Sequence, residues 1–211
     1  IGVDTSNYTT SLAAADSDGK IIANIKRLLP VAEGERGLRQ SEALFAHTKA
    51  LPELIGNLSE AISLPDHRIA AVGFSSAPRF AKGSYMPCFL AGHSAAASIA
   101  CGAKAPLFSS SHQEGHIEAV KAFSPFADSS EVLARHFSGG TCELLRAAAV
   151  SGLRSHGAGS AYDIEIIGGS HDISFGQVID RAGVMMGMDF PAGAYMDRKA
   201  LAAGYSSKVL T

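Results

Sequence analysis

The sequence of 211 residues predicts an α/β fold. Three observations indicate this class: a start made of three strand-like segments, an alternation of helical and strand-like patterns after it, and a second strand-rich unit that begins near residue 132. Hydrophobic residues make up 46% of the chain, which is enough to bury a proper core in one large domain or two small ones. No low-complexity or charge-rich linker separates the two parts.

The first sixty residues predict three strands and a long helix. IGVDTS at 1–6 is strand-like and breaks at the polar turn NYTT, and SLAAAD and KIIANIKRLL read as two more strands joined by a hairpin turn at Asp18-Gly19. From 40 to 63 the apolar residues recur at helical spacing. Pro52 lies inside this run, so we expect a break or a kink there.

The rest of the chain alternates. RIAAVGFSS predicts a buried strand, FLAGHSAAASIACGA a helix that ends at Gly102, and APLFSSS a further strand, followed by a helix over 112–123. VLARHF and TCELLRAAAV predict two strands around Gly139-Gly140, and YDIEIIGG another. An apolar stripe then predicts a helix that Gly187 terminates, with the Met185-Met186 pair in the core.

Hydrophobicity, cysteine content and net charge restrict the expected location and partners of the protein. No apolar run approaches the length that spans a bilayer, and IGVDTSNYTT does not resemble a signal peptide. The three cysteines are far apart and form no CxxC pair, so we interpret them as ordinary thiols of a cytoplasmic protein without a membrane partner. The net charge of −2 does not attract nucleic acid, so an RNA partner would be met by local patches or through a partner subunit.

The stretch SSSHQEGHIEA at 109–119 is the most informative. On a helix His112 and His116 lie about 40° apart on one face, the arrangement that lets two imidazoles hold one metal ion. Glu114 would point about 200° away from His112, unlike the glutamate of the H-E-x-x-H metalloproteases, which follows the first histidine directly. The alternative is a pair of surface histidines at a helix start. Gly115 favours the metal site, because an interior helical glycine costs roughly 1 kcal/mol and suggests that something approaches the backbone closely.

Two glycine- or hydroxyl-rich turns allow two interpretations each. HFSGGTCEL at 136–144 is either a simple hairpin turn or a phosphate cradle, in which glycines let backbone N–H groups approach an anion. In VDTSNYTTS at 3–11, Asp4, Thr5 and Ser6 at a strand end could serve a phosphate or Mg²⁺, or could be turn residues.

The stretch QVIDRAGVMMGMDFPAGAYMDRK also supports two interpretations. Asp180 falls on the polar side of the predicted amphipathic helix, and Gly193 and Asp197 follow in a predicted turn. Taken alone, this stretch predicts a solvated helix face and a loop.

Together these pieces resemble one family. The order of DTS near the start, HxEGH, SGGT and xIDRAGxxxGxxFPAG resembles the TsaD family, formerly called O-sialoglycoprotein endopeptidases or M22 glycoproteases. The resemblance runs through nearly the whole chain, and HxEGH and FPAG are its most diagnostic parts. It implies the actin-like ATPase fold, which is ribonuclease H-like, with a three-stranded antiparallel meander at the start. We therefore expect one actin-like subdomain over 1–131, including the HxEGH helix, and the incomplete start of a second over 132–211.

The resemblance also implies a function and ligands. The family transfers threonylcarbamoyl from its adenylate to the adenosine of tRNA beside the anticodon. His112 and His116 match the family's metal pair, and His136 falls where other members have a metal-binding tyrosine, so iron or zinc is expected on three imidazoles. The metal would act as a Lewis acid and a template for the attack of the adenosine amine.

Further matches concern the nucleotide. The residues that match the binding segment for an adenine nucleotide with Mg²⁺, or for the threonylcarbamoyl-adenylate, are Phe137, Ser138, Gly139 and Gly140. Asp180, Gly193 and Asp197 match the residues that hold its ribose and adenine side. Thr5 and Ser6 are further expected binding residues, and Asp4 and Asp180 the expected catalytic acids.

The departures from the family pattern weaken the catalytic interpretation. Where the family reads E-T-S-C-D-E-T, this chain has DTSNYTT at 4–10, so two acidic residues are lost. Where it reads G-E-T-x-D-D-A-x-G-E-A-F-D-K, this chain has GGSHDISFGQVIDR at 168–181, with one aspartate and two glutamates replaced. Family members also continue past residue 211 with a further metal-binding aspartate. These differences suit a divergent paralogue that is weak or inactive as an isolated chain.

Three hypotheses follow. The leading one is a metal- and nucleotide-binding transferase of tRNA modification that meets tRNA through a complex. The rival is a non-catalytic partner subunit that pairs with another actin-like subunit, or dimerises, as the family's relative TsaB does. The third and weakest is a metalloprotease that acts on glycoproteins.

Overall fold

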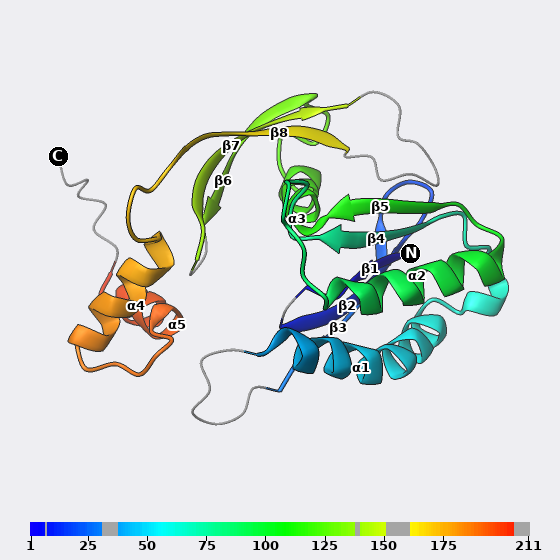
Figure 1. Ribbon diagram of the computed structural model, residues 1–211, viewed down its shortest axis with the longest axis horizontal. Coiled ribbons are helices and arrows are strands. Elements are labelled where there is room, and N and C mark those ends of the chain that lie inside the picture. Colours follow the sequence, from blue (N-terminus) through cyan, green and yellow to red (C-terminus); the bar gives the residue numbers. More distant parts are fainter. Residues whose placement is uncertain (7, 31–37, 138–139, 151–160, 205–211) are drawn as a thin grey trace. The chain divides into compact units, whose positions relative to one another are not determined.

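The computed structural model describes residues 1–6, 8–30, 38–137, 140–150 and 161–204. The chain divides into two compact units (Figure 1). The first unit comprises residues 1–128 together with 149–162, and the second comprises residues 129–148 together with 163–211. The return of the chain to the first unit at 149–162 is not predicted by the sequence.

The first unit is built on a five-stranded mixed sheet. Its strands are β1 (Gly2–Asp4), β2 (Thr9–Ala15), β3 (Ile21–Leu28), β4 (Val72–Ala77) and β5 (Leu107–Ser111), in the order β3-β2-β1-β4-β5. The first three strands pair antiparallel, and β4 pairs parallel with β1 and β5. Gly19 takes a φ of 80° in the turn between β2 and β3, as the hairpin signal predicts. The three-stranded antiparallel start and the mixed α/β class are therefore confirmed.

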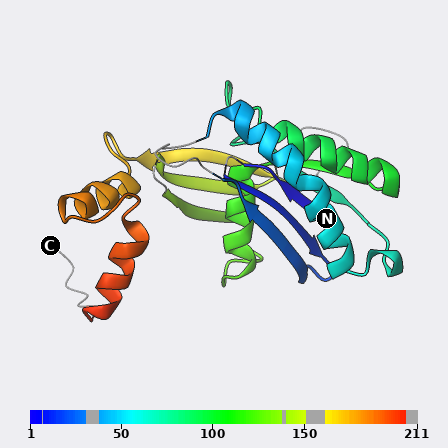
Figure 2. The same ribbon diagram turned by 90° about the horizontal axis from the view of Figure 1, so that it is seen from below.

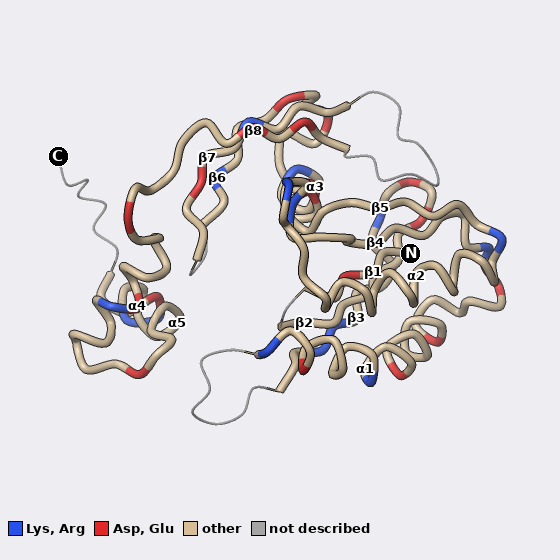
Figure 3. Tube along the Cα trace, viewed as in Figure 1, with Lys and Arg blue, Asp and Glu red and all other residues tan. Residues whose placement is uncertain are grey.

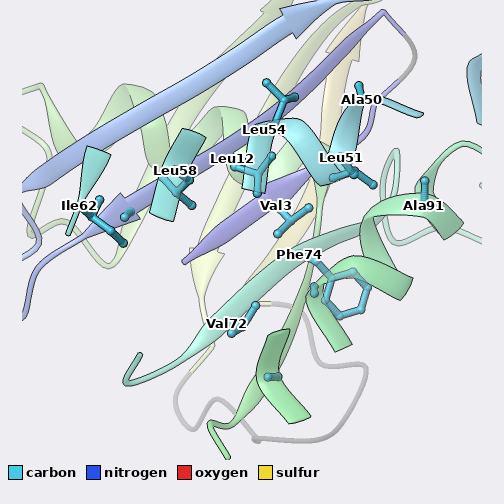
Figure 4. Packing of buried hydrophobic residues seen from close by; sticks show 13 residues of the cluster. Val3, Leu12, Ala50, Leu51, Leu54, Leu58, Ile62, Val72, Phe74 and Ala91 are labelled. Atoms are coloured by element: carbon cyan, nitrogen blue, oxygen red, sulfur yellow. The ribbon is translucent and has the colours of Figure 1, made fainter. Parts of the chain in front are cut away.

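Two long helices cover one face of this sheet. α1 (Gln40–Ala61) packs on β2 and β3, and α2 (Phe89–Ala103) packs on β1 and β4. The view in Figure 2 shows α1 and α2 side by side, and a short 3-10 helix, η1 (Leu64–Asp66), follows α1. Their buried side chains meet alternate strand residues in one cluster, drawn in Figure 4: Val3, Leu12, Leu51, Leu54, Leu58, Val72, Phe74 and Ala91.

The opposite face of the sheet carries small and polar residues. Because side chains alternate along a strand, Val3 enters the core while Gly2 and Asp4 face the other side. There α3 (His112–Ala122) contacts β4 and β5. This helix begins where β5 ends, and it brings the HxEGH residues to the sheet.

α1 continues through Pro52, so of the expected break or kink the break does not occur. A proline inside a helix removes one hydrogen bond and costs about 3 kcal/mol. Leu51, Leu54 and Leu58 are almost fully buried on either side of it, and burying one such side chain contributes about 1.5–3 kcal/mol. The apolar contacts on both sides of the proline therefore outweigh its cost.

The second unit contains a three-stranded sheet and two helices. β6 (Glu131–Phe137), β7 (Cys142–Ala149) and β8 (Tyr162–Gly169) follow one another in the sheet, and β6 pairs antiparallel with β7. α4 (Phe175–Met185) packs against α5 (Gly193–Ala202). The helices approach closely at Gly183, where a Cβ atom would collide with the Cβ of Ala192.

Two sequence predictions about this unit are wrong. Gly193 and Asp197 lie in α5 rather than in a turn, because the residues after Gly193 are good helix formers. Met185 and Met186 are 88% and 67% exposed rather than buried. Their position explains the difference: α4 meets α5 at Gly183, and both methionines lie beyond this contact at the end of the helix. The predicted stop at Gly187 is confirmed by its φ of 81°.

Among the residues that the structure describes, no helix is long and apolar enough to cross a membrane. Acidic and basic positions are interspersed along the described trace, as Figure 3 shows. This agrees with the small net charge of −2.

Candidate functional site

The HxEGH segment forms the first turns of α3, and its start is fixed by a capping box. Ser111, the N-cap, accepts a hydrogen bond from the Glu114 backbone N–H at 3.2 Å, and the Glu114 side chain accepts one from the Ser111 N–H at 2.6 Å. This reciprocal pair satisfies two backbone donors that a helix start otherwise leaves without partners. The helix therefore begins at His112.

The two histidines lie next to each other on α3, as their spacing predicts. The ring centroids of His112 and His116 are 4.3 Å apart, and the rings are inclined by 69°. No other part of the protein packs against Gly115, because a Cβ atom at this position would meet nothing within 4 Å; whether a ligand approaches its backbone stays a prediction. Gly115 lines a cavity together with His112 and His116.

The carboxylate of Asp4, at the end of β1, forms a hydrogen bond with the imidazole ring of His112. The Nδ1 atom of His112 lies 2.6 Å from Oδ2 of Asp4. The same carboxylate accepts a hydrogen bond from the Ser75 hydroxyl at 2.9 Å and one from the Ser6 backbone N–H at 2.6 Å. Burial raises the pKa of Asp4, but the hydrogen bonds and the charge of protonated His112 outweigh it and lower the pKa from 3.8 to about 2. Asp4 is therefore a carboxylate across the neutral range.

These side chains open into two cavities of the first unit. One has a volume of about 540 Å³ and is lined by Asp4, Ser6, Tyr8, His112 and His116, among others. The other, of about 490 Å³, also contains Asp4, His112 and His116 in its wall. Both volumes fall within the range of sites for small ligands. The acid–imidazole pair and the second histidine thus belong to a pocket large enough for a ligand.

Glu114 plays a structural part in this arrangement. Its side chain is 1% exposed, and beyond the capping bond it accepts hydrogen bonds from the backbone N–H groups of Ala161 at 2.7 Å and Tyr162 at 3.2 Å. A buried carboxylate that accepts several N–H donors cannot also activate a water molecule as a general base. The metalloprotease hypothesis has no general base at this position.

Thr5 is also used by the fold. It is fully buried, and its hydroxyl donates to the carbonyl of Cys88 at 2.9 Å and accepts from the N–H of Gly92 at 3.1 Å. These contacts fasten the first turn of α2 to the end of β1. A Cβ atom at Gly92 would lie 2.7 Å from the Thr5 hydroxyl, so this contact requires glycine. Both hydrogen-bonding roles of the hydroxyl are taken, and Thr5 does not face the cavities as a ligand.

Apart from Thr5 and Ser6, the residues expected around the nucleotide lie in the second unit. Phe137 packs against Phe175 with ring centroids 4.9 Å apart, and Gly140 is exposed. Ser138 and Gly139 lie outside the described residues. A phosphate cradle at this turn stays a prediction.

Asp180 has a definite partner in the second unit. Its side chain accepts a hydrogen bond from the Ala192 backbone N–H at 2.8 Å and so fixes the start of α5. Gly193 and Asp197 lie on that helix. Asp180 is therefore more than part of a solvated face, and its expected role toward a ribose or in catalysis stays a prediction.

The structure brings together two of the three imidazoles that were expected to bind a metal ion. The histidine pair of α3 supplies two imidazoles, whereas protein metal centres of this kind usually have three or four protein ligands. His136 lies on β6 in the second unit, where its Nδ1 atom is 3.9 Å from a Glu143 carboxylate oxygen. Within the described ranges, no group of three or more His, Cys, Asp or Glu side chains could hold a metal ion. Iron or zinc on three imidazoles stays a prediction.

Two features of the site were not found from the sequence. Ser75 lies on β4 and carries no signal beyond a hydroxyl in a strand. Tyr162 receives a hydrogen bond from Lys121 at 2.9 Å and contacts Glu118, so it joins the far end of α3 to the returning chain. Glu118 and Lys121 at helical spacing on α3 could have indicated a shared partner, but nothing in the sequence identifies Tyr162.

No protein-family model matches the chain. Among solved structures the chain is similar to YeaZ from Pseudomonas aeruginosa, with 14% sequence identity and a TM-score of 0.45. The match covers 77% of this chain and 65% of YeaZ, so this chain spans less than two thirds of the length of that protein.

Proposed function

We propose that this chain is an actin-like partner subunit in the modification of tRNA to threonylcarbamoyladenosine, with a non-catalytic role like that of TsaB. The system is suggested by the motifs that resemble the TsaD family, in their family order. The antiparallel meander that opens the mixed sheet agrees with an actin-like subdomain.

One observation favours a partner subunit over a catalytic subunit: the polar side chains at the end of β1 form hydrogen bonds within the protein. The hydroxyl of Thr5 is buried against α2, and the carboxylate of Asp4 accepts hydrogen bonds from His112, Ser75 and Ser6. Chemistry on a bound adenylate needs an acid or base within hydrogen-bonding reach of the reacting group. Tyr8 and Thr9, which stand where the family has acids, supply no carboxylate.

Exposed apolar side chains on the second unit support a protein partner. On α4 these include Phe175, Val178, Ile179 and Met185. Apolar side chains gathered on one element favour contact with another protein surface. We propose another actin-like subunit as the occupant of this surface.

The test combines binding with activity. The purified chain alone is expected to incorporate no radiolabelled threonine into unmodified tRNA when the upstream enzyme supplies the adenylate. It is expected to bind a TsaD-type catalytic subunit in isothermal titration and to raise that subunit's incorporation rate. Met185→Glu should weaken binding at least tenfold, whereas Gln177→Glu, with the same charge change on the same helix, should not. Turnover by the chain alone would refute the non-catalytic role, and an absence of binding would refute the partner role.

A second candidate function is favoured by the histidine pair, which a pure scaffold does not need. His112 and His116 lie side by side in the wall of a 540 Å³ cavity with Asp4. These two residues would hold iron or zinc, which would supply Lewis-acid chemistry in a TsaD-like transferase. Metal analysis of protein purified without chelator tests this candidate. His112→Ala and His116→Ala should each remove the metal and leave partner binding unchanged; metal retained by both variants would refute it.

A further inference from the structure

We propose that Asp4 and Ser75 are positioning residues that hold His112 with its proton on Nδ1 and its lone pair on Nε2, so that Nε2 is the atom presented to a ligand. The proposal concerns the pocket of the second candidate function, and it rests on that function only for the nature of the ligand. The ligand class is an electron-pair acceptor, of which a divalent cation is the one that two adjacent imidazoles favour.

Three segments far apart in the sequence create this contact. Asp4 ends β1, Ser75 lies on the neighbouring β4, and His112 follows β5, the next strand along. β1, β4 and β5 run parallel, so the same end of each strand meets at one edge of the sheet. The carboxylate, the hydroxyl and the imidazole are therefore brought together by the strand order itself.

The hydrogen bonds determine where the imidazole proton lies. An ionised carboxylate can only accept, so the 2.6 Å contact between Nδ1 of His112 and Oδ2 of Asp4 requires that Nδ1 donate. Ser75 can donate its hydroxyl proton to the same oxygen at 2.9 Å, and the Ser6 N–H binds the other oxygen at 2.6 Å. With donors on both oxygens the carboxylate cannot rotate away from the ring. In a neutral His112 the lone pair must then be on Nε2.

The surroundings of the ring fit this role. The His112 side chain is 32% exposed and lines both cavities, whereas the Asp4 side chain is 24% exposed. The centroid of the Phe89 ring lies 6.4 Å from that of the imidazole, and the centroid of the His116 ring lies 4.3 Å from it. A carboxylate behind an imidazole whose other nitrogen meets a ligand is the usual way in which proteins fix a ligating histidine. The arrangement thus assigns Asp4 an indirect role through His112, rather than direct contact with a nucleotide.

The test is to observe the tautomer directly. In long-range ¹H–¹⁵N spectra of the full ¹⁵N-labelled chain at about pH 8, the His112 signals are assigned by their absence in His112→Gln. We expect a single tautomer protonated on Nδ1, although an imidazole without a partner prefers its proton on Nε2. Asp4→Asn should convert this to a mixture, and Ser75→Ala, the milder change, should shift the population in the same direction. Asp16→Asn, which alters an acid of the β2–β3 turn with its own N–H partners, should change nothing.

The outcomes separate this proposal from the metal candidate. A tautomer protonated on Nε2 in the unchanged chain, or a tautomer that Asp4→Asn and Ser75→Ala both leave unaltered, would overturn the proposal. Zn²⁺ added to the same samples should perturb Nε2 of His112. A response at Nδ1 instead would also overturn it. An Nδ1–H tautomer with no Zn²⁺ response would support the positioning role while refuting the second candidate function.

Discussion

Replacement of Glu114 by glutamine tests the structural use of the HxEGH glutamate. The carboxylate accepts N–H groups from Ser111, Ala161 and Tyr162 while it is 1% exposed. An amide has one acceptor oxygen, so its NH₂ group must face at least one of these donors. The change removes one charge-assisted hydrogen bond, which contributes about 1.5–3 kcal/mol, and makes the others neutral and weaker. We expect Glu114→Gln to lower the free energy of unfolding by about 3 kcal/mol.

Two measurements check this value. At this chain length 1 kcal/mol corresponds to about 2–4 °C in Tm, so calorimetry should record a decrease of roughly 10 °C. Hydrogen exchange should also accelerate at the amides of Ala161 and Tyr162, because local opening there no longer breaks bonds to a charge. Glu60→Gln, an exposed glutamate on α1, serves as the control and should stay within about 0.5 kcal/mol. If Glu114→Gln matched this control in Tm and left the exchange of both amides unchanged, the assignment of Glu114 as a structural anchor would be refuted.

Three further predictions concern single positions. Gly92→Ala should destabilise the chain, because the new Cβ would lie 2.7 Å from the Thr5 hydroxyl, whereas Gly56→Ala, in open space on α1, should stabilise it by about 0.5–1 kcal/mol in urea denaturation; equal effects would contradict the contact. The pKa of Asp4 is lowered from 3.8 to about 2, so ionised Asp4 contributes about 2 kcal/mol to the free energy of unfolding. This contribution is complete above about pH 5 and is lost as the pH falls toward 2, and urea denaturation of Asp4→Asn should no longer show this loss. Gly183→Ala should separate α4 from α5 and speed hydrogen exchange in both helices, and unchanged exchange would show that the helices can adjust.

The order and type of most elements could be predicted because local patterns carry that information. Three strands, the helix with Pro52, the β4–α2–β5 alternation and the start of α3 all follow from periodicity and capping residues. The Asp18-Gly19 turn was predictable for the same reason, since glycine there permits a positive φ. These signals depend on residues a few positions apart.

The features that the sequence did not predict depend on distant contacts. Ser75 donates a hydrogen bond to Asp4 because β4 pairs with β1. The Thr5 hydroxyl is buried because it bonds to the start of α2. α5 was missed because Pro191 and Gly193 suggest a loop while Gly183, ten residues earlier, provides the groove into which the helix packs. In each case the deciding partner lies on another element.

The position of Glu114 has a consequence for how this chain folds during synthesis. Two of its donors, Ala161 and Tyr162, lie 47 and 48 residues further along the chain, beyond the β6–β7 hairpin, and therefore leave the ribosome after it. In a truncated chain that ends near residue 131, the Glu114 side chain would lack those two donors and would keep only the capping bond from Ser111, which weakens the start of α3. Folding of the first unit is therefore completed by a contact of high sequence separation, and such contacts slow folding. An expression fragment that ends at 131 would lack the Ala161 and Tyr162 donors, whereas one that extends through Tyr162 would contain every backbone donor to the Glu114 side chain.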